Sequence, residues 1–440
     1  MSALYPRRML AAACLVAALV PIARADGDCE DQSAIVQLAP GASVVGFHAQ
    51  YGTSSLDEIP GRGIHLVSVP EGTNYGDLAQ AVAGDPQVQG IEQNCLVSDE
   101  SPEGGTRSFF FNVAPGTFEA QPAASLAQLD TAGAYSRGRG VVVAVLDTGV
   151  APHPLIASQI APGGFNLVGK NSDTSDVGDG LDNDGDGLID EMVGHGTFIA
   201  GLVLRAAPQA RILPVRVMND EGISSTFLLT AGIYHAANAG ASILNISMGT
   251  TQPSALLENA VEFAAGRGCV VVASVGNEGN ATPIRYPAGY VQHGVLAVAA
   301  TTDEDRRADF SNYGPHVSLC APGVDVASAD TVSAWVAASG TSYSAPLVAG
   351  TAALLRRIAP HAGPALIRSA LLDACDPIDA LNPGYEGQLG RGRLNAVRAV
   401  RDPRLTQALS WDRRSALRPG SPPPARPAGL SPAGTQRLAR

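Results

Sequence analysis

The sequence is poor in the residues that mark several classes of protein. Lys170 is its only lysine, and acidic residues outnumber basic ones by 41 to 29, for a net charge of −12. A chain this acidic does not offer the basic surface that holds a nucleic-acid backbone, so we expect no nucleic-acid partner. Six cysteines in 440 residues are too few for a scaffold held together by disulfides. Charged residues make up 16% of the chain and apolar residues 45%, which excludes global disorder and allows a sizeable core.

Long apolar runs are also missing, apart from one near the N-terminus. There, two arginines precede an apolar run at 9–20, and a small-x-small cleavage site follows at 23–25. The run is shorter than the roughly 20 residues that span a bilayer. It predicts a signal peptide over residues 1–25, in preference to a buried helix or a lipoprotein anchor at Cys14. No later segment is apolar enough to cross a membrane, so we expect a secreted protein with no membrane span, located in the periplasm or outside the cell.

Strand and helix patterns divide the rest of the chain into a small and a large unit. The small unit, 33–98, is of α+β type, with strand-like runs at 34–38, 63–69 and 88–97 and a short helix at 75–82. A stretch rich in Pro, Gly, Ser and Glu follows at 99–124. Its composition fits either a plain loop or a cleavable junction, and we predict a linker there.

The large unit, about 125–400, alternates β-branched runs with helical patterns. The strand-like runs lie at 141–146, 212–217, 242–246, 270–275 and 295–300, and the helical patterns at 197–204, 226–239 and 255–265. Strands that are apolar throughout predict a doubly wound α/β domain with a mostly parallel sheet covered on both faces. In such sheets, active sites gather at the carboxyl ends of the strands. Residues 401–440 are rich in Pro, Arg and Ser, and we predict a disordered tail.

Four polar residues of the large unit stand at strand ends or helix starts. Asp147 ends a buried strand, and His195 stands between two glycines at the start of a helix. Asn277 follows the strand-like run at 270–275, and Ser342 follows a Gly-Thr pair and opens a helix. A helix N-terminus favours developing negative charge, which suits a nucleophilic serine. Each residue alone is as well explained by a turn, a cap or a surface position, so the prediction depends on the combination.

These four residues, in the order Asp147, His195, Asn277, Ser342, closely resemble the catalytic set of the subtilisin-like serine peptidases. The segments that match the family are 143–149, 195–201, 244–249, 275–279, 310–314, 321–323 and 340–346. The resemblance implies a subtilisin-like fold for 125–400 and a serine endopeptidase that hydrolyses proteins or peptides through an acyl-enzyme. Ser342 would be the nucleophile, His195 the general base, Asp147 the residue that orients it, and Asn277 a donor of the oxyanion hole.

The same resemblance extends to the N-terminal unit. Residues 26–98 are similar to the inhibitory propeptide of the family, a ferredoxin-like βαββαβ module that assists folding and blocks the cleft until it is cleaved. The protein would then be a monomeric zymogen whose own propeptide is its intramolecular inhibitor. The first and last strands of that module are antiparallel neighbours, so Cys29 and Cys95 would lie close enough for a disulfide.

Two further sites rest on resemblance. Substrate strands in the family pair with the segment equivalent to Ser247-Met248-Gly249, and Thr250 replaces the second glycine that usually follows. The loop at 182–190 resembles the start of an EF-hand and implies a structural calcium ion, with no organic cofactor. The expected ligands are Asp182, Asp184, Asp186, Leu188 and Asp190; a solvated acidic loop is the alternative.

Two other functions stay open at this stage. One is a catalytically silent binding protein on the same fold, and the other is a processing protease of narrow specificity. The complete set of four residues argues against the first, because a binding role would not need all of them. Specificity depends on the shape of the substrate pockets, which the sequence does not reveal.

Overall fold

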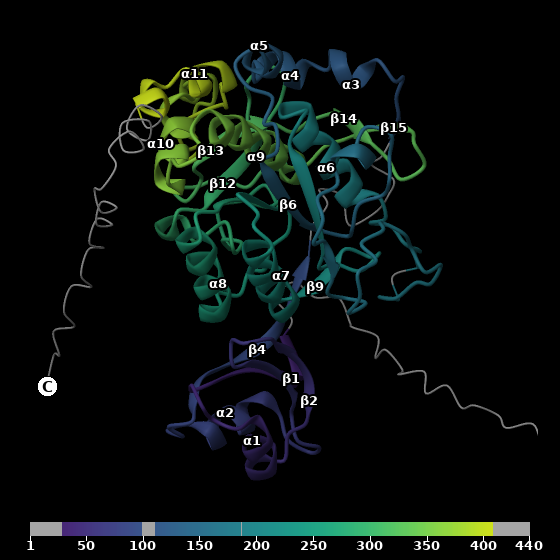
Figure 1. Cartoon of the computed structure of the whole chain (residues 1–440), viewed down its shortest axis with the longest axis vertical. Helices are drawn as coiled ribbons and strands as arrows, with labels where there is room; N and C mark the ends of the chain where they lie inside the picture. The colour runs from purple at the N-terminus through teal and green to yellow at the C-terminus, as the bar shows by residue number, and fades with distance from the viewer. Residues whose placement is uncertain (1–28, 99–110, 186, 408–440) are drawn as a thin grey trace, which may run out of the picture.

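Figure 1 shows the computed structural model of the chain, which describes residues 29–98, 111–185 and 187–407. The expected signal peptide, residues 99–110 of the expected linker and most of the expected tail lie outside these ranges. Nowhere in the described ranges does a helix combine the length and the apolar character that a membrane span requires. A small N-terminal unit and a large unit stand one above the other (Figure 1).

The small unit is a four-stranded antiparallel sheet with two helices. Its elements are β1 (Cys29–Leu38), α1 (Val44–Tyr51), β2 (Ser55–Ile59), β3 (Ile64–Ser68), α2 (Tyr75–Val82) and β4 (Val88–Ser98). The strand order is β2-β3-β1-β4, so the expected βαββαβ arrangement is confirmed. Cys29 lies opposite Cys95 across β1 and β4, and a disulfide joins them as expected.

Successive residues of β1 belong to two different cores. Ala34, Val36 and Leu38 pack with α1 and α2, whereas Ile35 belongs to a core cluster of the large unit. Side chains alternate across a strand. One face of the small sheet therefore packs on its own helices, and the other face packs on the large unit.

The large unit is built on a seven-stranded parallel sheet with the strand order β13-β12-β11-β10-β6-β8-β7. In chain order, its main elements are β6 (Val142–Asp147), β7 (Phe165–Asn166), α6 (His195–Ala206), β8 (Arg211–Arg216), α7 (Thr226–Asn238), β10 (Ile243–Ile246), α8 (Ala255–Gly266), β11 (Val270–Ser274), β12 (Leu296–Thr301), β13 (Leu319–Pro322) and α9 (Thr341–Ile358). Shorter or peripheral elements are α5 (Leu129–Gly133), β9 (Ile223–Ser225), β14 (Val326–Ala329), β15 (Trp335–Ala338), α10 (Pro364–Asp373) and α11 (Ala396–Val400).

Helices cover both faces of this sheet. Val143 and Val145 of β6 pack in one cluster with α6 and α9, and Ala144 and Leu146 pack in another with α7 and α8. Each strand therefore buries both of its faces, which explains why these runs are apolar throughout. The predicted doubly wound α/β architecture is confirmed.

The expected linker and tail both extended too far into the folded protein. The chain folds onto the large unit from Phe111 onward, through β5 (Phe111–Asn112), α3 (Thr117–Ala120) and α4 (Pro122–Leu126), and β5 pairs with β15. At the other end, Leu405 is fully buried in the core that contains α9, so residues 401–407 are not a free tail. Elements this short carry too few residues to show a period, which is why the composition of these stretches concealed them.

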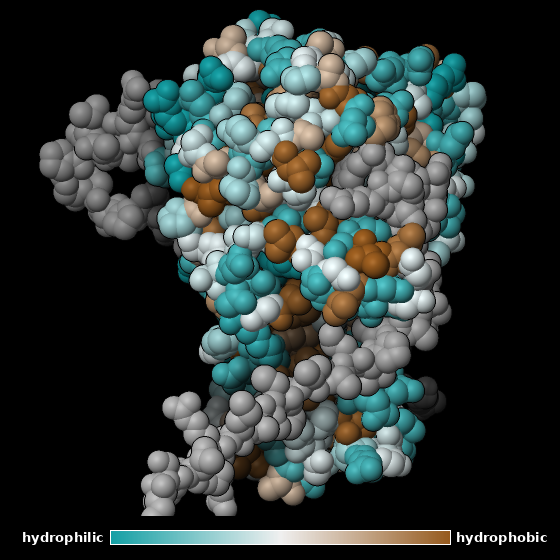
Figure 2. Space-filling model, turned by 90° about the vertical axis from the view of Figure 1, so that its right-hand side faces the viewer, coloured by the Kyte–Doolittle hydropathy of each residue, from teal (hydrophilic) through white to brown (hydrophobic). Residues whose placement is uncertain are grey.

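The two units share a continuous stretch of sheet. Residues 96–98 of β4 pair antiparallel with β9 of the large unit, and Val97 is fully buried there. Figure 2 shows apolar side chains near the narrow part of the molecule, where the two units meet. The small unit is thus attached to the large one by both main-chain pairing and apolar packing.

Candidate active site

Asp147 and His195 form a buried pair at the carboxyl edge of the parallel sheet. Asp147 is the last residue of β6, and α6 begins at His195 after Gly194, whose φ of 101° suits glycine. His195 Nδ1 lies 2.8 Å from Asp147 Oδ1, with the two side chains 1% and 0% exposed. A β-carbon at Gly196 would lie 2.1 Å from the Gly149 carbonyl oxygen, so glycine is needed for the two segments to approach. An imidazole bonded to a carboxylate through Nδ1 is fixed in the tautomer that uses Nε2 as a base.

Ser342 lies beside this pair, as the second residue of α9. The ring of Tyr343 is 5.6 Å from the His195 ring, centroid to centroid, and the Ser342 hydroxyl donates to the Ser247 carbonyl oxygen at 3.3 Å. Pro346 has no N–H to donate to the Ser342 carbonyl four residues earlier in the helix. Ser247 Oγ donates to that carbonyl instead, at 3.0 Å. The side chain of Ser247 therefore supports the turn that carries the serine.

Asn277 follows β11 and faces the same turn. Thr341 donates to Asn277 Oδ1 twice, from its N–H at 2.8 Å and from its hydroxyl at 2.9 Å. The amide nitrogen must then point the other way, and a β-carbon at Gly340 would lie 3.8 Å from it. An N–H donor fixed beside a serine at a helix N-terminus is the arrangement that stabilises an oxyanion. The structure therefore brings together all four residues that the sequence singled out.

The segment Ser247-Met248-Gly249 lies next to the end of the small unit. Gly249 and Ser98 exchange two main-chain hydrogen bonds, of 2.9 and 3.1 Å, in an antiparallel bridge. Thr250, the departure from the family pattern, pairs with Tyr286 through main-chain bonds of 3.0 and 2.8 Å. The edge at Gly249 can thus accept an extended strand, and here it holds the last described residue of β4.

The acidic loop before α6 is the segment that was expected to bind calcium. Asp182 accepts hydrogen bonds from the N–H groups of Gly185 and Gly187, at 2.6 and 3.0 Å, and Asp186 lies outside the described residues. Carboxylate oxygens of Asp179, Asp190 and Asp220 lie within 4.8 Å of one another. Of the five expected ligands, only Asp190 belongs to this group. Burial, followed by the nearby Asp179, raises the pKa of Asp220.

Sequence reasoning missed Asp176, which is 1% exposed and lies behind the Asp147–His195 pair. It accepts hydrogen bonds from Thr148, Gly194 and Thr197. It is one of several aspartates in an acid-rich stretch, and no feature of the sequence distinguishes it from its neighbours. Its surroundings come from segments that are far apart along the chain.

Comparison with known proteins agrees with this geometry. Residues 138–397 match the subtilase family (Peptidase_S8). Thermitase from Thermoactinomyces vulgaris is 36% identical over 266 residues, which cover 60% of this chain and 90% of thermitase. Subtilisin Savinase from Lederbergia lenta is 36% identical over 273 residues, which cover 60% of this chain and 92% of that protein.

A solved structure shows the same fold over a longer stretch. It is fervidolysin from Fervidobacterium pennivorans, described as a keratinolytic enzyme related to subtilisin, with a TM-score of 0.69 and 23% identity. The match covers 86% of this chain and 62% of fervidolysin, so this chain spans less than two thirds of that protein's length. The family match, the two sequence relatives and the shared fold lead to one conclusion: this chain belongs to the subtilase family of serine endopeptidases.

Proposed function

We propose that this protein is a secreted endopeptidase, made as a zymogen, that cleaves peptide bonds with the triad Asp147, His195 and Ser342. The observation that carries the proposal is the 2.8 Å contact between His195 Nδ1 and Asp147 Oδ1 in a buried pair beside the turn of Ser342. No organic cofactor is required for this chemistry. Replacing Ser342 tests the proposal directly. Both peptide hydrolysis and labelling by a fluorophosphonate should be lost in that variant.

The proposed reaction proceeds through an acyl-enzyme. Ser342 Oγ attacks the scissile carbonyl while His195 Nε2 takes the hydroxyl proton, which it then delivers to the leaving amine. Asp147 keeps the imidazole in the required tautomer and stabilises the imidazolium. The amide of Asn277 and the main-chain N–H of Ser342 donate to the oxyanion. Water, activated by the same imidazole, then releases the acyl group and restores Ser342.

The zymogen proposal is supported by the way β4 occupies the substrate edge. β4 pairs with β9 on one side and with Gly249 on the other, as an added substrate strand would. Two side chains of β4 itself also accept hydrogen bonds at the starts of two helices of the large unit. Glu92 accepts from the N–H groups of Ala255 and Leu256 at the start of α8, at 2.8 and 3.2 Å, and Asn94 accepts from Phe227 in α7 at 3.2 Å. Negative charge at a helix N-terminus is favourable, so removing the small unit would leave these helix ends without those partners.

Two cationic side chains add to this interface. The Arg62 guanidinium lies 4.4 Å from the ring centroid of Tyr234 in α7 and 3.8 Å from that of Phe263 in α8. The only lysine of the chain, Lys170, lies 3.0 Å from Asp57 of the small unit. Lys170 is largely exposed and Asp57 is partly exposed, so this pair contributes little. The arginine contacts two aromatic faces at once, so we expect it to be the stronger of the two attachments.

Arg62→Ala is expected to weaken retention of the cleaved propeptide about tenfold, because it removes two cation–π contacts of roughly 0.5–2 kcal/mol together. The wild-type and variant chains would each be processed and isolated as the non-covalent complex. Each complex would then be diluted, and the protein concentration at which half the activity is released would be measured.

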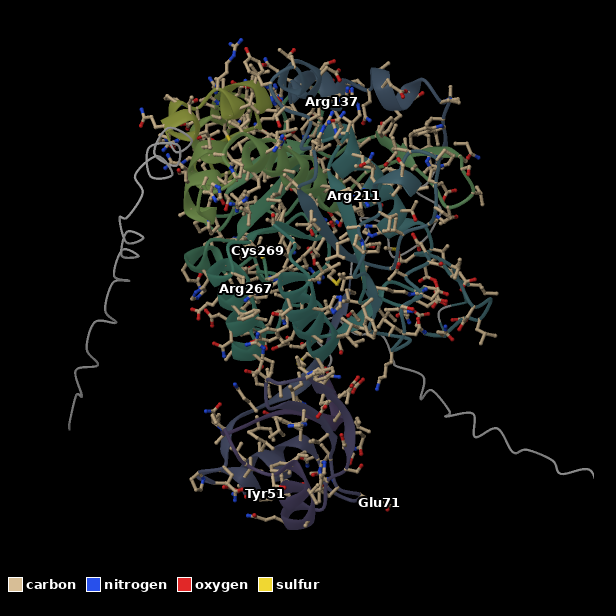
Figure 3. The ribbon with its side chains drawn as sticks, viewed as in Figure 1. Tyr51, Glu71, Arg137, Arg211, Arg267 and Cys269 are labelled. Atoms are coloured by element: carbon tan, nitrogen blue, oxygen red, sulfur yellow. A yellow bond between two sulfur atoms is a disulfide. The ribbon has the colours of Figure 1, made fainter. Side chains whose placement is uncertain are left out.

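A matched control is Glu71→Gln, which also removes one charge from the small unit. Figure 3 places Glu71 near the far end of that unit, away from the large one. The half-release concentration should be unchanged in this variant. Equal half-release concentrations for Arg62→Ala and the wild type would show that Arg62 does not hold the propeptide.

The group formed by Asp179, Asp190 and Asp220 is a candidate site for a structural calcium ion. Asp179, Asp190 and Asp220 offer hard oxygen donors, and three carboxylates this close repel one another without a cation. A β-carbon at Gly178 would lie 2.1 Å from the Asp190 carboxyl carbon, so a glycine makes room for that side chain. We propose that these three residues hold the ion, which would order the chain ahead of α6 and take no part in catalysis.

Chelation is expected to lower the melting temperature by roughly 5 °C, because about 1–2 kcal/mol of binding free energy is lost, and added calcium should restore it. Asp190→Asn should remove this calcium dependence. Asp182→Asn should retain it, because Asp182 is not one of the three proposed ligands. Melting temperatures measured with chelator and with calcium would check this. If Asp182→Asn lost the calcium dependence and Asp190→Asn kept it, the ion would instead be bound by the loop at 182–190.

A further inference from the structure

A second buried carboxylate, Asp176, lies behind the Asp147–His195 pair. Its Oδ1 accepts from Thr148 Oγ1 at 3.0 Å and from the Gly194 N–H at 3.0 Å. Its Oδ2 accepts from the N–H and the hydroxyl of Thr197, at 3.0 and 2.6 Å. A single side chain therefore receives four hydrogen bonds from two separate segments.

These two segments are the ones that carry the catalytic aspartate and histidine. Thr148 directly follows Asp147, and its N–H donates at 2.8 Å to Asp147 Oδ1, the oxygen that His195 Nδ1 also contacts. Gly194 and Thr197 flank His195 at the start of α6. The Gly196 N–H also donates to Thr148 Oγ1 at 3.0 Å. Asp176 therefore connects the end of β6 to the start of α6, at the point where Asp147 meets His195.

We propose that Asp176 is a positioning residue of the triad, which sets the separation and orientation of Asp147 and His195 by holding both of their segments. This inference rests on the proposed function. It adds a residue that touches neither substrate nor the reacting atoms and that acts through the main chain and Thr148. Positioning errors of about 1 Å in a catalytic group can cost about 100-fold in rate.

Capping of α6 alone does not account for these contacts. The first N–H groups of a helix lack partners within the helix, and the N-cap residue Gly194 has no side chain to supply one. Bonds to the Gly194 and Thr197 N–H groups would satisfy that need. The Thr148 hydroxyl accepts from the Gly196 N–H of α6 and donates to Asp176, and it thereby links the carboxylate to the strand of Asp147 as well as to the helix. Burial raises the pKa of Asp176 and the nearby Asp147 raises it further, while the bonds from Thr197 and Gly194 oppose this shift.

Asp176→Asn tests the proposal with almost no change in side-chain size. An amide accepts at its oxygen only, so at least one of the main-chain N–H groups at the start of α6 loses its acceptor. We expect kcat on a peptide substrate to fall 10–100-fold while KM stays within about threefold, because the substrate edge at Gly249 is not touched. The full chain would be expressed and processed, and kcat, KM and the melting temperature measured.

Thr148 variants test the connection between Asp176 and the strand of Asp147. Thr148→Val removes that connection and also the acceptor of the Gly196 N–H, while Asp176 keeps its bonds to the Gly194 and Thr197 N–H groups. We expect a 5–20-fold fall in kcat. Thr148→Ser keeps the hydroxyl and should retain wild-type kcat within twofold. If both residues act through one connection, the Thr148→Val, Asp176→Asn double variant should lose no more than Asp176→Asn alone.

Asp130→Asn is the control for a general disturbance of α6, since it breaks the 2.7 Å pair with Arg205 at the far end of that helix. Its kcat should be unchanged. A lower melting temperature with unchanged kcat in Asp176→Asn, or additive losses in the double variant, would reduce Asp176 to a helix cap and overturn the inference. An inactive wild-type protein that fails to react with fluorophosphonate would instead reject the proposed function, so the two failures are distinguishable.

Discussion

Ser342→Ala should lower kcat for peptide hydrolysis by about 10⁵-fold or more, the scale of loss on removing the nucleophile of such a triad. The side chain is 1% exposed, and its hydroxyl makes a long 3.3 Å bond to the Ser247 carbonyl. Replacing serine by alanine removes only this hydroxyl. Alanine is smaller than serine and favours a helix. The melting temperature should therefore change little while activity is lost. Measuring kcat and melting temperature on the same preparation would check both expectations.

The same variant also tests the zymogen. A chain without its nucleophile should remain a single uncleaved polypeptide when purified alone, and should be cut when a trace of active wild-type protein is added. Gel analysis before and after that addition distinguishes self-processing from cleavage by a host enzyme. Cleavage of pure Ser342→Ala without any addition would contradict processing by this active site.

Ser344→Ala is the matched control, two residues further along α9. Ser344 is fully buried, and its hydroxyl donates to the carbonyl oxygen of Ala321 at 3.0 Å, so its role is structural. We expect a lower melting temperature and a kcat within a few-fold of wild type. If Ser344→Ala abolished fluorophosphonate labelling and Ser342→Ala did not, the nucleophile would have been assigned to the wrong serine.

The parts of this protein that the sequence predicted well are those with a local signal. The parallel strands are apolar because both of their faces are covered. The predicted run at 141–146 therefore differs by only one residue at each end from the observed strand β6 (Val142–Asp147). His195 stands between two glycines whose backbone geometry the structure uses. Gly196 allows α6 to approach the segment of Asp147, and that requirement is visible in the sequence as a glycine.

The features that the sequence did not reveal depend on contacts between distant segments. Asp176 and Asp179 differ by three positions and look alike in the sequence, yet the first is 1% exposed and the second is exposed. The packing of Thr148 and Thr197 around Asp176 creates that difference. Asp182, Asp184 and Asp186 at alternate positions suggested a calcium loop, whereas the carboxylates of Asp179, Asp190 and Asp220 come together only through the fold.

Asn277→Ala is expected to lower kcat 100–1,000-fold with little change in KM, as loss of one oxyanion-hole donor does in enzymes of this type. The amide has one orientation, because Thr341 donates to Oδ1 from both its N–H and its hydroxyl. The orientation of the donor atom Nδ2 is therefore fixed before any substrate is bound. Preorganised donors of this kind act on the transition state rather than on the ground state, so the loss should appear in kcat.

Asn277→Asp sharpens this test, because it keeps the acceptor for Thr341 and replaces the donor by an oxygen. If donation to the oxyanion is the role of Asn277, this nearly isosteric variant should be at least as slow as the alanine variant, although its packing is intact. Thr341→Ser keeps both bonds to Oδ1 and should stay near wild type. Binding of a peptide aldehyde that forms a tetrahedral adduct should weaken in Asn277→Asp by about the same factor as kcat/KM falls. A kcat within threefold of wild type in both Asn277 variants would show that main-chain N–H groups alone stabilise the oxyanion in this protein.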